Sequence, residues 1–147
     1  MTALKLEEFL PFRLVRAADA VSMDFAHVYK QKHDLSRPEW RVLANLAQLG
    51  RTTATEIGAR SSMHKTKVSR AVFELEKRKW LLRKTDENDR RVEWLELTKI
   101  GHAKFEGLAV LAREFESNLL AELGAEATRQ LLSALKKLES MQLSTMR

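Results

Sequence analysis

The chain has 147 residues, of which 44% are hydrophobic, so it is long and apolar enough to fold as one unit around a hydrophobic core. It has no cysteine, which excludes thiolate catalysis, disulfide bonds, cysteine-ligated zinc and cysteine redox sensing. No apolar run approaches the roughly 18 residues that span a bilayer, and the acidic N-terminus is unlike a signal peptide. We therefore expect a soluble, cytoplasmic protein with no membrane partner.

The first two predicted helices lie in the N-terminal third of the chain. The spacing of apolar residues predicts an amphipathic helix from about residue 9 to residue 33, preceded by a short arm. Ser36 and Glu39 then form a capping box, which predicts that a second helix begins there. That helix is expected to stop near Gly50.

The middle of the chain predicts two shorter helices separated by a turn. Thr53 or Thr55 can cap the first, and Ser61 and Ser62 interrupt its apolar pattern as a turn would. Residues 63–79 follow as a basic helix with one apolar face.

A hairpin and two further helices complete the pattern. Residues 81–97 predict two strands joined at the polar tip DEND. Thr98 can cap a helix that reaches about Leu123, and Gly124 separates it from a final helix. The two shorter helices and the hairpin together are typical of a small winged helix.

The long terminal helices are amphipathic and cannot bury their apolar sides against this winged helix alone. A symmetric dimer would cover those apolar sides.

The net charge of the chain lies in one segment. Residues 36–100 contain 15 Lys/Arg and 9 Asp/Glu, an excess that equals the net charge of +6. Residues 1–35 and residues 101–147 each contain equal numbers of basic and acidic side chains. A positive surface confined to one module is typical of a nucleic-acid-binding protein.

Three segments together resemble the MarR family of winged helix-turn-helix regulators. They are LSRPEWRVLANL at 35–46, KTKVSRAVFELEKRKWL at 65–81 and DENDRRVEWLELTKIG at 86–101. The resemblance implies a mostly α fold, with a winged helix-turn-helix at 36–100 flanked by dimerisation helices at 1–35 and 101–147. The whole chain, 1–147, would form a single unit.

The resemblance also implies a homodimer that binds a pseudo-palindromic operator in double-stranded DNA. One helix would enter the major groove, while Arg91, held by Asp89, would enter the minor groove. Two departures from the family pattern are Ser61–Ser62, where an apolar residue and Gly are usual, and His64, where an acidic residue is common. The predicted DNA-binding residues are Ser62, His64, Lys65, Thr66, Lys67, Ser69, Arg70, Asp89, Arg90 and Arg91.

The same resemblance implies a pocket for a small anionic aromatic ligand, such as an aromatic acid or its thioester. An arginine fork suits a carboxylate, and His or Tyr could orient a phenol. Ordinary helix-surface charges and core packing are the competing interpretation of every residue in this set. The candidates are Arg13, Arg16, Phe25, His27, Tyr29, Trp40 and Arg41.

Four functions fit this pattern to different degrees. A repressor released by such a ligand is favoured, and a ligand-independent or architectural DNA-binding protein of the same fold is the alternative. An enzyme is not expected, because the sequence has no Gly-rich phosphate loop, nucleophile elbow or metal-binding motif. We accordingly expect no metal and no cofactor. A membrane-surface protein fits poorly, because the long helices carry no net charge.

Overall fold

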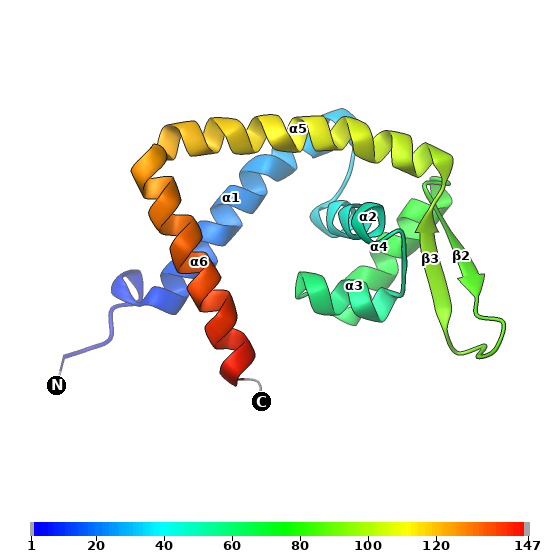
Figure 1. Cartoon of the computed structure of the whole chain (residues 1–147), viewed down its shortest axis with the longest axis horizontal. Coiled ribbons are helices and arrows are strands. Elements are labelled where there is room, and N and C mark those ends of the chain that lie inside the picture. Colours follow the sequence, from blue (N-terminus) through cyan, green and yellow to red (C-terminus); the bar gives the residue numbers. More distant parts are fainter. Residues whose placement is uncertain (1, 146–147) are drawn as a thin grey trace. The chain divides into compact units, whose positions relative to one another are not determined.

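The computed structural model describes residues 2–145. The chain divides into two compact units, Met1–Leu111 and Ala112–Arg147. The first contains most of the secondary structure, including a small sheet, and the second is a pair of helical segments (Figure 1).

The first unit begins with a 3₁₀ turn at Leu6–Glu8 and the long helix α1, Leu10–His33. Its predicted start and end are confirmed. The helix ends because Asp34 adopts a left-handed conformation (φ 51°, ψ 45°), which breaks the helical hydrogen-bond pattern.

Helix α2, Arg37–Leu49, begins at the predicted cap. The Ser36 hydroxyl accepts a hydrogen bond from the backbone N–H of Glu39 at 3.2 Å and donates to the Glu39 carboxylate at 2.6 Å. At its other end Gly50 has φ 81°, a value that glycine adopts without a Cβ clash.

Helices α3, Ala54–Ser61, and α4, Lys65–Lys77, form the predicted helix pair. Thr53, not Thr55, caps α3 by accepting from the N–H of Glu56. Ser62 occupies the left-handed turn at φ 51°, so serine takes the place usual for glycine. Helix α4 is two residues shorter at each end than predicted.

The end of α4 has a recognisable backbone motif. Lys79 is left-handed (φ 65°), its N–H bonds to the Glu76 carbonyl, and the Trp80 N–H bonds to the Leu75 carbonyl at 3.0 Å. This is the Schellman pattern, and it stops the helix abruptly before the sheet.

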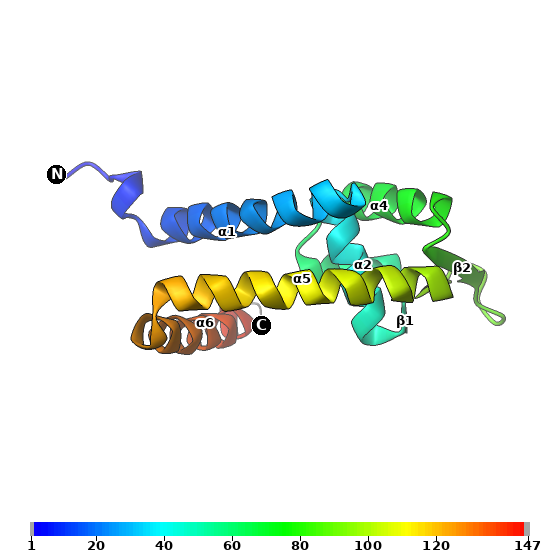
Figure 2. The ribbon, with the colours of Figure 1, turned by 90° about the horizontal axis from the view of Figure 1, so that it is seen from above.

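Three strands form an antiparallel sheet in the order β1-β3-β2. Strands β2, Leu81–Thr85, and β3, Glu93–Leu97, make the predicted hairpin, with Leu81 opposite Leu97. The connection runs over 86–92 and is longer than the predicted four-residue tip. The sequence prediction missed β1, Arg51–Thr52, which pairs with β3 and is labelled in Figure 2.

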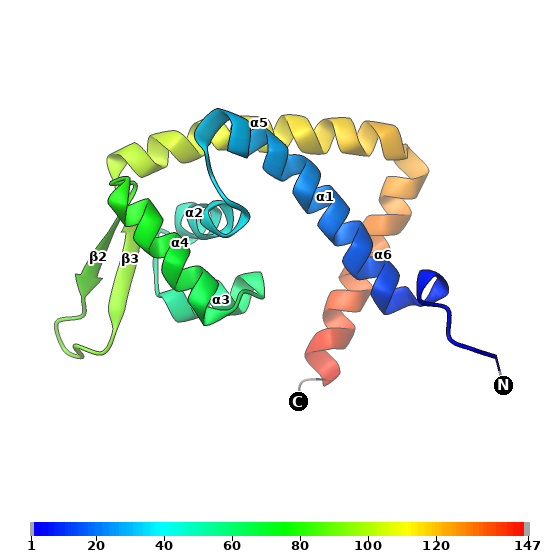
Figure 3. The ribbon, with the colours of Figure 1, turned by 180° about the vertical axis from the view of Figure 1, so that it is seen from behind.

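Helix α4 lies against α2, α3 and β2, and the hairpin extends beyond it (Figure 3). The core beneath it consists of fully buried aliphatic residues from these elements, with the aromatic residue Trp80 at its edge. Trp40 is partly buried against the same core, so the core role predicted for both tryptophans is confirmed. The buried members from α2 to β3 are Val42, Leu43, Leu46, Ile57, Val68, Ala71, Val72, Leu75, Trp80, Leu81, Leu95 and Leu97.

Helix α5, Lys99–Leu123, starts in the first unit, where its first turn lies against Trp80, the residue before β2. The Thr98 hydroxyl accepts from the Gly101 N–H at 3.1 Å, which confirms the predicted cap. A Cβ on Gly101 would stand 2.0 Å from the Trp80 carbonyl oxygen. Glycine is therefore required there by contact, not by backbone angle.

The second unit contains the end of α5 and helix α6, Ala125–Thr145. Gly124, at φ 85°, breaks the helix as predicted. Thr128 donates to the Leu120 carbonyl, and Arg129 pairs with Glu126 on the surface.

The predicted mostly α, winged helix-turn-helix fold is thus confirmed. Across the part of the chain that the structure describes, no helix is long and apolar enough to cross a membrane.

Replacing Gly101 by alanine should lower the free energy of unfolding by about 2–3 kcal/mol, since the new methyl group overlaps a backbone carbonyl that cannot move freely. Urea denaturation followed by circular dichroism measures this. Gly107 is the matched control on the same helix, because a Cβ added there would have nothing within 4 Å. Gly107→Ala should raise stability by about 0.5–1 kcal/mol. Equal effects of the two substitutions would contradict the contact.

Candidate nucleic-acid interface

Helix α4 presents a polar, basic face to solvent. Val68, Ala71, Val72 and Leu75 are buried on its inner side. The outer side carries the major-groove candidates from the sequence, which all prove to be exposed: Lys65, Thr66, Lys67, Ser69 and Arg70. A shallow groove runs along this outer face between α4 and β2. Lys65, Thr66, Ser69 and Arg70 line this groove, while Lys67 lines a second depression that faces the start of α2.

The start of α4 is fixed by His64, a role that the sequence prediction missed. Its imidazole Nδ1 accepts a hydrogen bond from the Thr66 N–H at 3.2 Å, which makes His64 the N-cap. Ser62 and His64 are both exposed beside this helix start. Their predicted contact with a phosphate stays a prediction.

The loop between β2 and β3 is organised by Asp86. One carboxylate oxygen accepts from the indole N–H of Trp94 at 2.9 Å. The other accepts from the backbone N–H groups of Asn88 and Asp89 at 3.0 and 2.9 Å. Because a single side chain holds both the strand and the tip, the loop has a defined shape although it is exposed.

Asp89 in turn holds Arg91. Its Oδ1 accepts from the backbone N–H of Arg91 at 3.0 Å and from Nε at 3.1 Å, while Oδ2 accepts from a terminal guanidinium nitrogen at 3.1 Å. The Arg91 side chain is nevertheless 90% exposed. The pair implied by the family resemblance is present, and it points a preoriented guanidinium into solvent. Arg90 beside it is also exposed.

Both carboxylates are stabilised in their charged form. The indole hydrogen bond from Trp94 is the main cause that lowers the pKa of Asp86 below its usual value, helped by the two backbone N–H groups. Side-chain and backbone hydrogen bonds from Arg91 lower the pKa of Asp89. The order they give the loop is present above the ordinary pKa of an aspartate and is lost as the pH falls through the lowered values.

Strand β1 braces the other side of the loop. The Arg51 guanidinium stacks over the Trp94 ring at 4.6 Å. Lys84 pairs with Glu96 at 2.6 Å across the two long strands, and this hydrogen bond lowers the pKa of Glu96. The stacking contact is not predictable from sequence pattern, because Arg51 lies more than forty residues from Trp94.

Arg83 joins the sheet to α4. It donates to Glu93 at 2.8 Å and to Glu76 at 3.1 Å, and these bonds, Glu93 first, raise its pKa further above the usual arginine value. Arg83 and Lys84 are therefore both paired with carboxylates, so their charges are partly neutralised within the protein.

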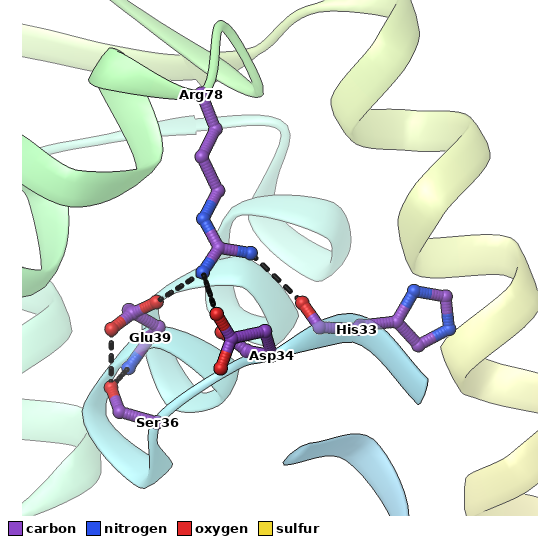
Figure 4. Close-up of polar contacts among 5 residues, drawn as sticks. All are labelled: His33, Asp34, Ser36, Glu39 and Arg78. Atoms are coloured by element: carbon purple, nitrogen blue, oxygen red, sulfur yellow. Dashed lines mark hydrogen bonds and ion pairs between the residues drawn. The ribbon is translucent and has the colours of Figure 1, made fainter. Parts of the chain in front are cut away.

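Arg78 ties the end of α4 to the turn between α1 and α2 (Figure 4). Its guanidinium donates to the carbonyl of His33 at 2.9 Å and to the carbonyl of Asp34. It also lies 3.6 Å from the buried Oε1 of Glu39 and 5.0 Å from the Trp80 ring centroid. That Oε1 atom makes no hydrogen bond among the described residues, so the arginine charge compensates it.

Three of the predicted ligand residues meet in an aromatic cluster. Phe25 makes edge contacts with Tyr29 and Trp40, both at 5.1 Å between ring centroids, and Trp40 stacks on Phe105 at 6.0 Å. Tyr29 is buried, and burial raises the pKa of its hydroxyl, opposed by the charges of Arg37 and Arg41. The rings fill one another's space, as the core-packing interpretation expects.

The other ligand candidates lie outside this cluster. His27 is exposed on α1, and Arg41 is half-buried on α2 near Tyr29. Arg13 and Arg16 are exposed near the start of α1, with Arg16 over the Phe12 ring. At 1.5 Å per residue, Arg13 is about 24 Å along the helix from Tyr29. One chain therefore does not gather all seven candidates around one small molecule.

Among the described residues, no group of three His, Cys, Asp or Glu side chains is arranged to hold a metal ion.

Known proteins share this combination of helices and hairpin. The model of the MarR family matches residues 35–92, from the start of α2 to the loop at 86–92 that joins β2 and β3, which we call the wing loop. The solved structure of a MarR/EmrR family transcriptional regulator from Acinetobacter sp. ADP1 superposes with a TM-score of 0.83 at 25% identity, covering 96% of this chain and 99% of that one. Over residues 35–92, the chain is thus similar to the MarR family.

A curated relative of this chain is the uncharacterized HTH-type transcriptional regulator YwoH of Bacillus subtilis (strain 168), 33% identical over 84 residues. That match covers 57% of the chain and only 61% of YwoH, so it spans less than two thirds of the relative.

Two further structures share the fold. A cysteine-to-serine mutant of MarR from E. coli, complexed with operator DNA, has a TM-score of 0.79 at 22% identity and covers 93% of this chain and 99% of that one. NadR in complex with 4-hydroxyphenylacetate has a TM-score of 0.75 at 22% identity, with 94% and 97% covered. At these identities the similarity shows the fold alone.

Trp94→Phe should raise the pKa of Asp86 toward its usual value, because the phenyl ring fills the same place but cannot donate the hydrogen bond. A titration of the side-chain carboxyl carbons by NMR measures this. The control is Glu96 on the same strand, whose pKa is lowered mainly by its hydrogen bond with Lys84 and should move far less than that of Asp86. An unchanged Asp86 pKa would show that the indole contact does not stabilise the carboxylate.

Arg78→Met should lower the free energy of unfolding by about 2–3 kcal/mol, because it leaves a buried carboxylate oxygen and two carbonyls without their partner. Adding Glu39→Gln should recover part of this loss. Arg129→Met is the matched control, since its pair with Glu126 is exposed and is worth about 0.5 kcal/mol or less. Equal losses at the two arginines would refute the special role of Arg78.

Proposed function

We propose that this chain is a sequence-specific DNA-binding regulator of transcription. The observation that carries the proposal is the pairing of an exposed basic helix face with a wing arginine that is preoriented by its own aspartate. Both features lie in the segment that holds the whole net charge. No catalytic role is proposed for any residue.

Helix α4 is the element proposed to enter the major groove. The groove of B-DNA is about 12 Å wide and accepts one α-helix. The first two turns of such a helix usually meet the base edges, and here they carry Lys65, Thr66, Ser69 and Arg70, all exposed. Hydroxyl and guanidinium groups can donate to base edges and to phosphates, so the face has the required chemistry.

The wing is proposed to reach the minor groove through Arg91. A narrow A·T-rich minor groove has a strongly negative potential that attracts an inserted arginine. Asp89 holds the guanidinium in a fixed direction, which reduces the entropy lost on binding. Arg90, adjacent and exposed, is proposed to contact the phosphate backbone.

A second copy of the chain is proposed to cover apolar surface that the two units each expose. Single exposed apolar residues are ordinary, but a concentration on terminal helices is typical of an interface. In the first unit the N-terminal segment exposes Leu4, Leu6, Phe9, Leu10, Leu14, Val15, Val21 and Met23. In the second unit the exposed set includes Leu123, Leu131, Leu132, Leu135 and Met141. A homodimer would present two α4 helices to a pseudo-palindromic operator.

Repression that is relieved by an anionic aromatic ligand is the mode of regulation that we propose. E. coli MarR in complex with operator DNA and NadR in complex with 4-hydroxyphenylacetate have the same fold and support both halves of this proposal. Such a protein would act in the cytoplasm. A ligand-independent DNA-binding protein is the alternative, favoured by the filled aromatic cluster around Tyr29. Release of bound DNA by an aromatic acid or its thioester discriminates the two.

The function is tested with an operator selected from random duplexes, with affinity measured by fluorescence anisotropy. Arg91→Ala should weaken binding more than tenfold, because the minor-groove contact is lost while α4 is unchanged. Arg129→Ala is the matched control, an arginine of the second unit that is likewise paired with an acidic neighbour, and should bind as the unchanged protein does.

Salt dependence is a second readout for the same complex. Affinity should fall steeply as salt rises, and Arg91→Ala should reduce the slope, since a cation in the minor groove also releases counterions. Failure of any duplex to be selected, or a salt-independent affinity, would refute DNA binding. Equal affinity of Arg91→Ala would refute only the role of the wing.

A further inference from the structure

Phe73 is an exposed aromatic residue in the middle of the outer face of α4. Its side chain is 56% exposed, while its neighbours Val72 and Leu75 are buried in the core. Phe73 belongs neither to the buried core cluster nor to the partly buried residues that pack against that cluster. Nothing in the described fold therefore requires a phenyl ring at this position.

The position of Phe73 on the helix is specific. At about 100° per residue, Phe73 lies only about 20° around the helix from Thr66, one heptad earlier, and about 60° from Arg70, three residues earlier. It lines the same shallow groove as these two residues, together with Lys65, Ser69 and Arg83. A large apolar ring thus stands in the row of side chains proposed to face DNA.

The residues around the Phe73 ring favour a binding partner that is negatively charged overall and carries an apolar group. Lys65, Arg70 and Lys77 are exposed on the same helix, and among the described residues no acidic side chain lines the groove. This charge is complementary to nucleic acid and unfavourable for a basic protein surface. Within the major groove, the one apolar group on a base edge is the C5-methyl group of thymine.

We propose that Phe73 contacts the C5-methyl group of a thymine and selects for that base in each half of the operator. This inference rests on the proposed function. Phe73 is about 10.5 Å along α4 from Thr66, close to the width of the major groove. A ring at this distance from Thr66 still lies within the span of the groove, where thymine methyl groups project from the base edges.

The contact has a definite energetic signature. Deleting one buried methyl group costs about 0.8 kcal/mol, which corresponds to about a fourfold loss of affinity. Because a homodimer would make the contact in both half-sites, deletion in both should cost about fifteenfold. The loss would arise only where the methyl group touches the ring.

Deoxyuridine provides the probe, since it differs from thymidine only by this methyl group. Each thymine of the selected operator is replaced in turn by deoxyuridine, in both half-sites at once, and the affinities of the unchanged protein and of Phe73→Ala are compared. We expect one symmetric pair of positions at which deoxyuridine weakens the unchanged protein about fifteenfold and has no effect on Phe73→Ala.

Two further variants complete the double-mutant comparison. Phe73→Leu keeps an apolar side chain and should retain part of the penalty at that position. Ile100→Ala removes another exposed apolar side chain, 51% exposed on α5, and should leave the whole pattern unchanged. Circular dichroism confirms that each variant is folded, and Phe73→Leu serves for the comparison if Phe73→Ala is not.

The outcomes separate this inference from the function on which it rests. Specific DNA binding with the same deoxyuridine penalties in the unchanged protein and in both Phe73 variants would overturn the thymine contact and leave DNA binding intact. Absence of specific binding by the unchanged protein would overturn both. A change in oligomeric state in Phe73→Ala, measured by light scattering, with no change in the thymine pattern would assign the ring to a protein contact instead.

Discussion

The position of α4 depends on the contacts that the Arg78 guanidinium makes with the start of the domain. This guanidinium connects the end of that helix to the turn that follows α1 and to the first turn of α2, through two carbonyls and one buried carboxylate. Hydrophobic contact alone would allow α4 to slide along the core, because the hydrophobic effect is not directional. The Arg78 guanidinium is planar and its donors point in fixed directions, so it holds α4 in one position. The basic outer face of α4 is therefore presented at a set angle.

The wing reaches a comparable order by a different route. Its contacts are almost entirely local, from Trp94 to Asp86, from Asp86 to Asp89 and from Asp89 to Arg91. Each of these links is an exposed or half-exposed hydrogen bond to a carboxylate, and none relies on a hydrophobic core. The wing can therefore loosen without disturbing α4. The stacking of Arg51 on Trp94 couples the wing to the far edge of the sheet.

The features that sequence predicts well are those fixed by neighbouring residues. The caps at Ser36 and Thr98, the breaks at Gly50 and Gly124 and the fold of the hairpin depend on side chains within a few positions of one another. The same holds for the Asp89–Arg91 pair. These motifs have strong local preferences that tertiary contacts did not override.

The features that sequence misses depend on residues far apart in the chain. Strand β1 has only two residues and no periodicity to detect, and Arg78 bonds to carbonyls more than forty positions away. The cap at His64 is the exception, because it is a local contact with the N–H of Thr66 and was missed for a different reason: histidine is not among the usual N-cap residues. The predicted ligand residues have suitable chemistry, but helical rise along α1 separates several of them.

The left-handed residues at the two ends of α4 have a consequence for how this chain can vary. Ser62 and Lys79 both have positive φ angles, a conformation that costs about 1–3 kcal/mol without glycine. The helix therefore cannot lengthen or shift by one residue without forcing a different side chain into each turn. An insertion or deletion inside 63–78 would rotate all later side chains by about 100° against the wing. This segment should accept exchanges of side chains but not changes of length.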